Sequence, residues 1–206
     1  EQAQVHDRML VGQLPDDEEG QSDGSRQRQQ LDLAAGEPVE FLALVQHDLQ
    51  GADPDDQQRE AAQLAEHRRN FSGLDVSLVN IDQLYNEFSS GGKDPTAIRD
   101  FARMLLERNP DKFEYLLLFG DGSFDPRNNT GSTENKDFVP VFETAESFDP
   151  IRAYPSDDYF GLLSPDESGS LGGKLDIAVG RLTTGTAADA QAIVDKIIAY
   201  DKDPAT

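Results

Sequence analysis

The stretch Tyr115-Leu116-Leu117-Leu118-Phe119-Gly120-Asp121-Gly122 is the most hydrophobic strand-like segment of the chain and ends in a glycine-flanked aspartate. A short, nearly continuous apolar run is typical of a parallel strand covered on both faces. Open α/β sheets bind ligands at the edge where such strands end. The stretch therefore predicts a buried parallel strand that places Asp121 at a candidate ligand edge.

Strands and helices are expected to alternate on both sides of this segment. The expected strands are Val39 to Val45, Val76 to Val79, a short one at Phe138–Phe142, and Ile177–Val179. The first two expected helices are 55–69, after Asp53-Pro54, and Asp82–Phe88. Asp94-Pro95 opens a third helix, which is expected to bury Ile98, Phe101, Ala102, Leu105 and Leu106. Thr186 and Asp189 open the last helix, which is expected to bury Ala190, Ile193, Val194, Ile197 and Ile198. This alternation predicts an α/β fold with a mainly parallel sheet and helices on both faces.

Residues 1–38 differ from the rest because they show little hydrophobic periodicity. The polar run over 15–30 buries too little apolar surface to offset its ordering entropy, which indicates a loop or linker. Short strands at Met9–Val11 and Leu31–Leu33 are expected to frame it. We interpret 1–38 as a linker or the trailing edge of a preceding β domain, and 39–206 as one α/β unit.

The composition is strongly acidic, with 40 Asp and Glu against 18 Lys and Arg and a net charge of −22. Such a surface repels nucleic acid. No apolar run approaches the length of a membrane span, so direct membrane insertion is not expected. Asp outnumbers Glu and Lys is scarce, which favours adaptation to a salty medium over an ordinary acidic exported protein.

Four aspartates are candidate metal ligands. Asp121, helped by Asp125, could bind a metal or a substrate, or it could cap its own turn by accepting backbone N–H groups. Asp158, in the pair Asp157-Asp158, suits a hard cation, preferably Ca²⁺, with turn capping as the alternative. Asp176 introduces an apolar strand and needs a partner, which could be a cation, Arg181 or solvent. Arg181 is expected to be a salt-bridged structural residue.

No catalytic residue and no organic cofactor site is expected in this chain. The sequence contains no cysteine, so a thiolate nucleophile, a disulfide and a zinc-thiolate site are excluded. The three histidines, His6, His47 and His67, share no metal spacing, and His67 is expected to be solvated on a polar helix. Ser123 lacks the sequence context of a serine hydrolase nucleophile.

Several motifs occur in the order found in a known family. These motifs are Leu84 to Gly91, Asp94 to Phe101, Leu116 to Asp121, Tyr154 to Gly161, Leu175 to Arg181 and Val194 to Tyr200. Together they resemble the gingipain-like peptidase family C25. Within it they resemble the PorU-type members, cell-surface peptidases that process cargo of the type IX secretion system.

This resemblance implies the first subdomain of a caspase-like α/β catalytic region. The catalytic His and Cys of that family would then lie downstream, in the second subdomain. The resemblance also implies calcium, with Asp121 and Asp176 as ligands, and an exported parent at the cell surface or outer membrane that acts on secreted proteins. The expected partner of this chain is the downstream catalytic subdomain of the same parent.

The expected function is that of a non-catalytic N-terminal portion of a cysteine peptidase, inactive by itself. One alternative is a cargo- or partner-binding module on a peptidase-derived fold. Another is a Mg²⁺-dependent enzyme that brings Asp121, Asp125 and Asp158 together.

Overall fold

The computed structural model describes residues 41–46, 59–133, 137–144, 151, 154–165, 167 and 172–204. The predictions for 1–38, His47 and the helix start at Asp53-Pro54 fall outside these residues. Among the described residues, no helix has both the length and the apolar character that crossing a membrane requires.

A four-stranded parallel sheet forms the centre of the described unit, in the order β2-β1-β3-β6. Its strands are β1 (Phe41–Gln46), β2 (Asp75–Asn80), β3 (Phe113–Phe119) and β6 (Ala178–Leu182). The central strand predicted from Tyr115–Phe119 lies between β1 and β6. The predicted α/β fold with a parallel sheet is confirmed.

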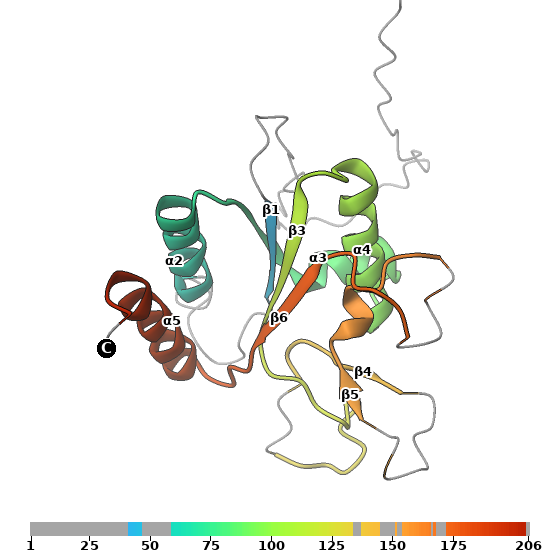
Figure 1. Ribbon diagram of the computed structural model, residues 1–206. Coiled ribbons are helices and arrows are strands. Elements are labelled where there is room, and N and C mark those ends of the chain that lie inside the picture. The colour runs from blue at the N-terminus through green and yellow to red at the C-terminus, as the bar shows by residue number, and fades with distance from the viewer. Residues whose placement is uncertain are drawn as a thin grey trace, which may run out of the picture. The chain divides into compact units, whose positions relative to one another are not determined.

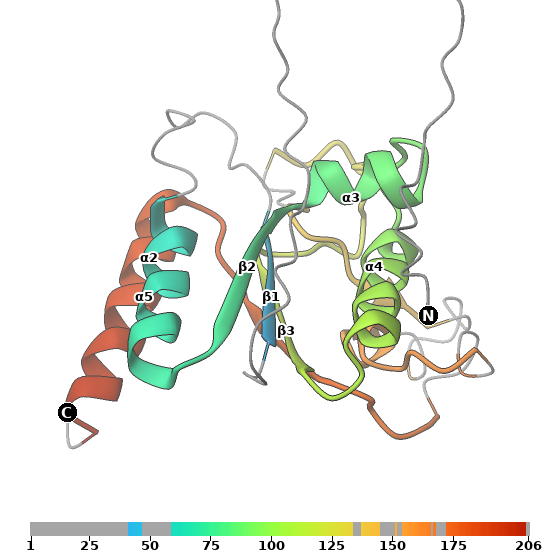
Figure 2. The ribbon, with the colours of Figure 1, turned by 90° about the horizontal axis from the view of Figure 1, so that it is seen from above.

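Helices cover the sheet from both sides (Figures 1 and 2). On one side lie α2 (Arg59–His67), which continues as a π-helix (Arg68–Ser72), and α5 (Ala187–Lys202). On the other side lie α3 (Ile81–Phe88) and α4 (Pro95–Arg108). We call these the α2 side and the α4 side.

The helix starts follow the capping signals in the sequence. The side chain of Asp94 accepts a hydrogen bond from the backbone N–H of Thr96, and Pro95 begins α4. The hydroxyl of Thr186 accepts the N–H of Asp189 at 3.1 Å and donates to its carboxylate at 2.8 Å. Side chains bonded in this way satisfy N–H groups that a helix leaves without partners, so these starts were predictable.

The expected strand at Phe138–Phe142 is wrong for most of its length. Only Phe142 and Glu143 form a strand, β4, which pairs antiparallel with β5 (Pro155–Ser156). The amides of Phe138 and Val139 donate to the carbonyl of Asp121 instead. Pro140 has no amide hydrogen, which removes one donor that a regular ladder over this stretch would use.

Candidate functional site

The carboxyl ends of β3 and β6 meet at one edge of the sheet, which we call the carboxyl edge. There the amide of Gly120 donates to the carbonyl of Leu182 at 2.9 Å, and that of Asp121 donates to Thr184 at 3.0 Å. The loop after β3 is therefore fastened to the segment after β6. The predicted placement of Asp121 at this edge is confirmed.

Glycines allow the segment 138–141 to pack against this loop. A Cβ atom on Gly120, whose φ is +152°, would lie 2.9 Å from Val139, and one on Gly122 would lie 2.7 Å from Val141. Both distances are shorter than a carbon–carbon contact permits, so larger residues would push the segment away. The segment that approaches these glycines is the chain's own segment 138–141.

Arg181, at the end of β6, holds together the loops at the carboxyl edge. Its side chain donates to both carboxylate oxygens of Asp157, at 2.7 and 2.8 Å, and to the carbonyl oxygens of Gly120, Val139 and Pro140 at 2.7 to 3.0 Å. Only 9% of the side chain is exposed. The expectation of a salt-bridged structural arginine is confirmed, with Asp157 as its partner.

A second ion pair holds the same loop from the α4 side. Lys93 lies 2.6 Å from Asp137 Oδ2, and Asp137 Oδ1 accepts the amide of Ser123 at 3.0 Å. Burial, followed by the negative charges of Asp137, Asp82 and Asp94, raises the pKa of the nearby Tyr85 hydroxyl. The loop is thus anchored from two sides. Neither Lys93 nor Asp137 was predicted, because neither belongs to a recognisable spacing.

Two of the predicted metal ligands cap turns in their own loop. Asp121 Oδ1 accepts the amide of Gly122 at 2.9 Å. The buried Asp125 accepts the amides of Asn129 and Thr130, at 2.9 and 2.8 Å, and the Thr130 hydroxyl at 2.8 Å. The amide of Thr130, followed by that of Asn129, lowers the pKa of Asp125 below its ordinary value of 3.8. This geometry agrees with turn capping.

The other two predicted ligands lie apart from them. Asp158 is exposed at the start of a short 3₁₀-helix (Asp158–Phe160). Asp176 precedes β6, at the opposite end of the sheet from Asp121, and accepts the amide of Leu163 at 3.0 Å. From the β3–β6 register, we estimate the separation of Asp121 and Asp176 along the strands as roughly 25 Å.

The four aspartates therefore do not form a cation site by themselves. No group of three Asp, Glu or His side chains among the described residues lies close enough together to hold a metal ion. The Mg²⁺-dependent enzyme requires Asp121, Asp125 and Asp158 to converge, and the structure does not bring them together. A calcium site would need oxygen ligands from further residues.

His67 differs from its predicted solvated state. Its Nε2 lies 2.8 Å from Asp201 Oδ2, and only 11% of its side chain is exposed. Arg68 donates to the same oxygen, also at 2.8 Å. The expectation was wrong because α5 packs against α2 and covers this side chain, a tertiary contact that the helix sequence does not reveal.

Two of the comparisons with known proteins give matches. The model of peptidase family C25 matches residues 35–206. Among solved structures, the chain is similar to the crystal structure of dimeric latent PorU from Porphyromonas gingivalis, with a TM-score of 0.64 and 31% sequence identity. That match covers 82% of this chain and 16% of the PorU chain, so this chain spans about one sixth of that relative's length. A comparison with curated proteins gives no match.

Proposed function

Because the chain belongs to peptidase family C25, as a gingipain-like region of the PorU type, we propose that it is the non-catalytic first subdomain of a cysteine peptidase. One observation carries this proposal: the chain matches a cysteine-peptidase family over residues 35–206, and none of its 206 residues is a cysteine. The nucleophile of such an enzyme is a thiolate, and no other side chain supplies one. The catalytic His and Cys then belong to a downstream subdomain of the same parent.

The role of this subdomain is to provide a fixed surface for the catalytic half. The loop at the carboxyl edge is anchored by Arg181 and by the Lys93–Asp137 ion pair, and its amides are bonded to the end of β6. Residues that support a catalytic site have to be held rigidly, because small displacements slow the reaction. The parent is proposed to be exported, to reside at the cell surface or outer membrane, and to process secreted proteins.

The first test of this function is to sequence the parent reading frame beyond Thr206. A downstream His-Gly segment and a strand-ending Cys are expected. The purified chain 1–206 should then hydrolyse no fluorogenic peptide above the buffer rate, whereas the parent should hydrolyse it and lose activity when iodoacetamide alkylates its thiol. Turnover by the cysteine-free chain would refute the proposal. A reading frame without the His and Cys would favour the binding module.

The same proposal includes the binding of calcium by the complete catalytic region. Asp158 is exposed, and Asp176 is exposed with one hydrogen bond to its carboxylate, so both are open to a cation that also takes ligands from further residues. No catalytic step is assigned to this ion.

A further inference from the structure

The two sides of the sheet are buried to different extents. On β3, Leu116 and Leu118 point to the α4 side and are fully buried, whereas Tyr115 and Leu117, on the α2 side, are only half-buried. On β6, Ala178 and Gly180 are exposed, and the register aligns them with Tyr115 and Leu117. Parallel sheets are normally covered on both faces. The α2 side is therefore incompletely covered over β3 and β6.

The position of α5 explains the gap. Its first half packs onto the sheet, where Ala190 and Val194 join a buried cluster with Phe119. Its second half is held against α2, where Asp201 is bound by His67 and Arg68, and its Ile197 and Ile198 pack against the same cluster but stay partly exposed. The sequence predicted that Ala190, Ile193, Val194, Ile197 and Ile198 are buried on one stripe. Ala190 and Val194 are buried, whereas the three isoleucines are only partly buried.

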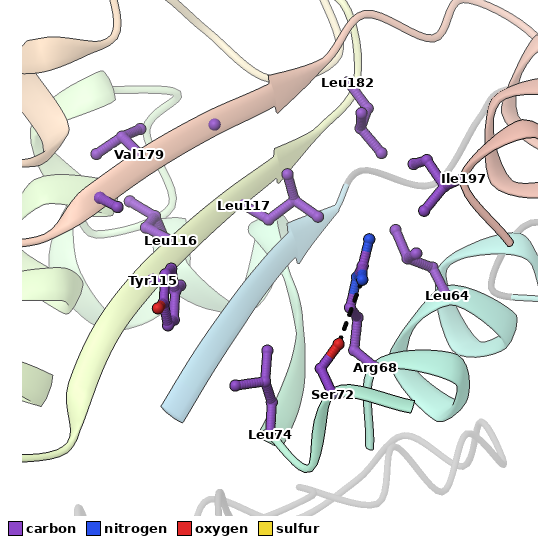
Figure 3. Close-up of a pocket in the computed structure, with 12 residues that line it drawn as sticks. Leu64, Arg68, Ser72, Leu74, Tyr115, Leu116, Leu117, Val179, Leu182 and Ile197 are labelled. Carbon is purple, nitrogen blue, oxygen red and sulfur yellow. Dashed lines mark hydrogen bonds between the residues drawn. The ribbon is translucent and has the colours of Figure 1, made fainter. Parts of the chain in front are cut away.

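An apolar groove of about 460 Å³ occupies the gap. Figure 3 shows Leu64 of α2 and Ile197 of α5 pointing toward Leu117 and Leu182 of the sheet. A second hollow, which shares Arg68, Leu182 and Ile197 with the groove, lies along α5 from Ile193 to Tyr200, which is 61% exposed. Two adjoining, mainly apolar hollows between helices and a sheet can take the apolar face of a further helix.

We propose that this groove receives an apolar helix of the downstream catalytic half of the same parent chain. The inference rests on the proposed function and names the surface through which the two halves dock. Tyr200 and Asp201, in the last turn of α5, line the second hollow, so a polypeptide that continues past α5 starts beside the groove. The match covers only 16% of the PorU chain, so a parent of similar length would have ample further sequence for such a helix. Covalent linkage gives it a high effective concentration.

A second copy of this chain is a poorer occupant. Among the described residues, the exposed large apolar side chains are scattered over the π-helix, separate loops and the end of α5: Phe71, Phe124, Ile151, Tyr154, Leu175 and Tyr200. They form no apolar ridge that could enter the groove of another copy. A helix with an apolar stripe from the downstream half fits the groove better than a second copy does.

The absence of cysteine permits a direct test by thiol labelling. Ala178→Cys places one thiol in the groove through a small change at an exposed strand position. Gln83→Cys, at an exposed position on α3 beside α4, is the matched control. Each substitution is made in the chain 1–206 and in the parent, and the rate of N-ethylmaleimide modification is read by mass spectrometry of the corresponding peptide. We expect Ala178→Cys to react at least tenfold more slowly in the parent than in 1–206, and Gln83→Cys to react at similar rates in both.

Each other result has a defined meaning. Equal protection of both positions in the parent, or no protection of Ala178→Cys, overturns the inference. Protection within 1–206 also overturns it: a second copy fills the groove if protection rises with concentration, and a segment of the chain itself fills it if protection does not. The peptidase activity of the same parent preparation separates the two proposals. An active parent with a reactive Ala178→Cys refutes only the docking surface. A parent without the catalytic pair refutes the proposed function, and a protected Ala178→Cys in it still shows that the downstream part of the parent covers the groove.

Discussion

Arg181 and Asp157 form a two-point ion pair across the carboxyl edge of the sheet, with Nε to Oδ2 at 2.7 Å and Nη2 to Oδ1 at 2.8 Å. The remaining donors of Arg181 bind three backbone carbonyls from the β3 end and the 139–140 segment. One guanidinium therefore holds together strands and loops that are up to 61 residues apart in sequence.

Replacing Arg181 should destabilise the chain more than breaking an exposed ion pair does. We expect Arg181→Met to lower the free energy of unfolding by about 3–5 kcal/mol, because it leaves Asp157 and three carbonyls without their donor. The matched control is Arg103→Met, which breaks the exposed Arg103–Glu107 pair and should cost about 0.5 kcal/mol or less. Urea unfolding of the chain measures both, and equal losses would contradict the assignment.

Asp125 should make stability fall at acid pH. Its pKa is lowered in the folded state, so its carboxylate stabilises the fold above pH 3.8, and this contribution is lost as the pH falls below that value through the folded-state pKa. Asp125→Asn should flatten the decline in urea midpoint between about pH 4 and pH 2. Asn129→Ala keeps the backbone amide that donates to Asp125, so this variant should retain most of the decline in urea midpoint. An unchanged decline in Asp125→Asn would refute the role of this carboxylate.

Most of the fold followed from local patterns. The apolar run at Tyr115–Phe119, the caps at Asp94 and Thr186, and the spacing of Ile98, Phe101, Ala102 and Leu105 each predicted an element that the structure contains. Short-range sequence patterns determine such elements, and the alternation of strands and helices then restricts the sheet order. The parts that failed depend on contacts between distant residues. His67 was wrongly predicted to be solvated, because its partner Asp201 lies 134 residues away in sequence. Phe138 and Val139 were wrongly predicted to form a strand, because their amides bond to the carbonyl of Asp121.

The candidate site was less predictable than the fold. Asp121 follows one apolar strand and Asp176 precedes another, so the predicted parallel sheet already implied that they lie at opposite ends, and naming both as ligands overlooked this. The reason is the direction of the two strands: the end of β3 and the start of β6 are at opposite edges. The role of Arg181 could be anticipated, because a charge at the end of an apolar strand requires partners.

The tether between α5 and α2 predicts a local opening. Asp201→Ala removes the acceptor that His67 and Arg68 share, so the last turn of α5 should exchange its amide hydrogens faster. Asp195→Ala, on the same helix, removes only a contact with Gln191 and should leave that turn unchanged. Hydrogen exchange read by mass spectrometry over 197–202 distinguishes the two variants. Equal exchange in both would mean that the shared acceptor does not hold the helix.

Calcium is expected to stabilise the complete catalytic region and not the chain 1–206 alone. The four predicted ligands do not converge, and Asp121 and Asp125 already accept backbone amides. Thermal melting of both proteins in Ca²⁺ and in Mg²⁺ measures this, with Asp158→Asn and Asp176→Asn in the parent as the variants that should reduce the Ca²⁺ effect. Ca²⁺-selective stabilisation of 1–206 would show that a site exists within it.

Salt should stabilise the chain strongly if its charge reflects adaptation to a salty medium. A net charge of −22 opposes compaction, and at molar ionic strength the screening length falls to about 3 Å. We therefore expect the melting temperature to rise steeply between dilute and molar KCl. Sucrose at equal osmolality controls for general stabilisation by excluded solutes, which do not screen charge. A melting temperature that stays constant in KCl, or that rises as much in sucrose, would remove charge repulsion as the cause and leave the acidic surface without a role in salt tolerance.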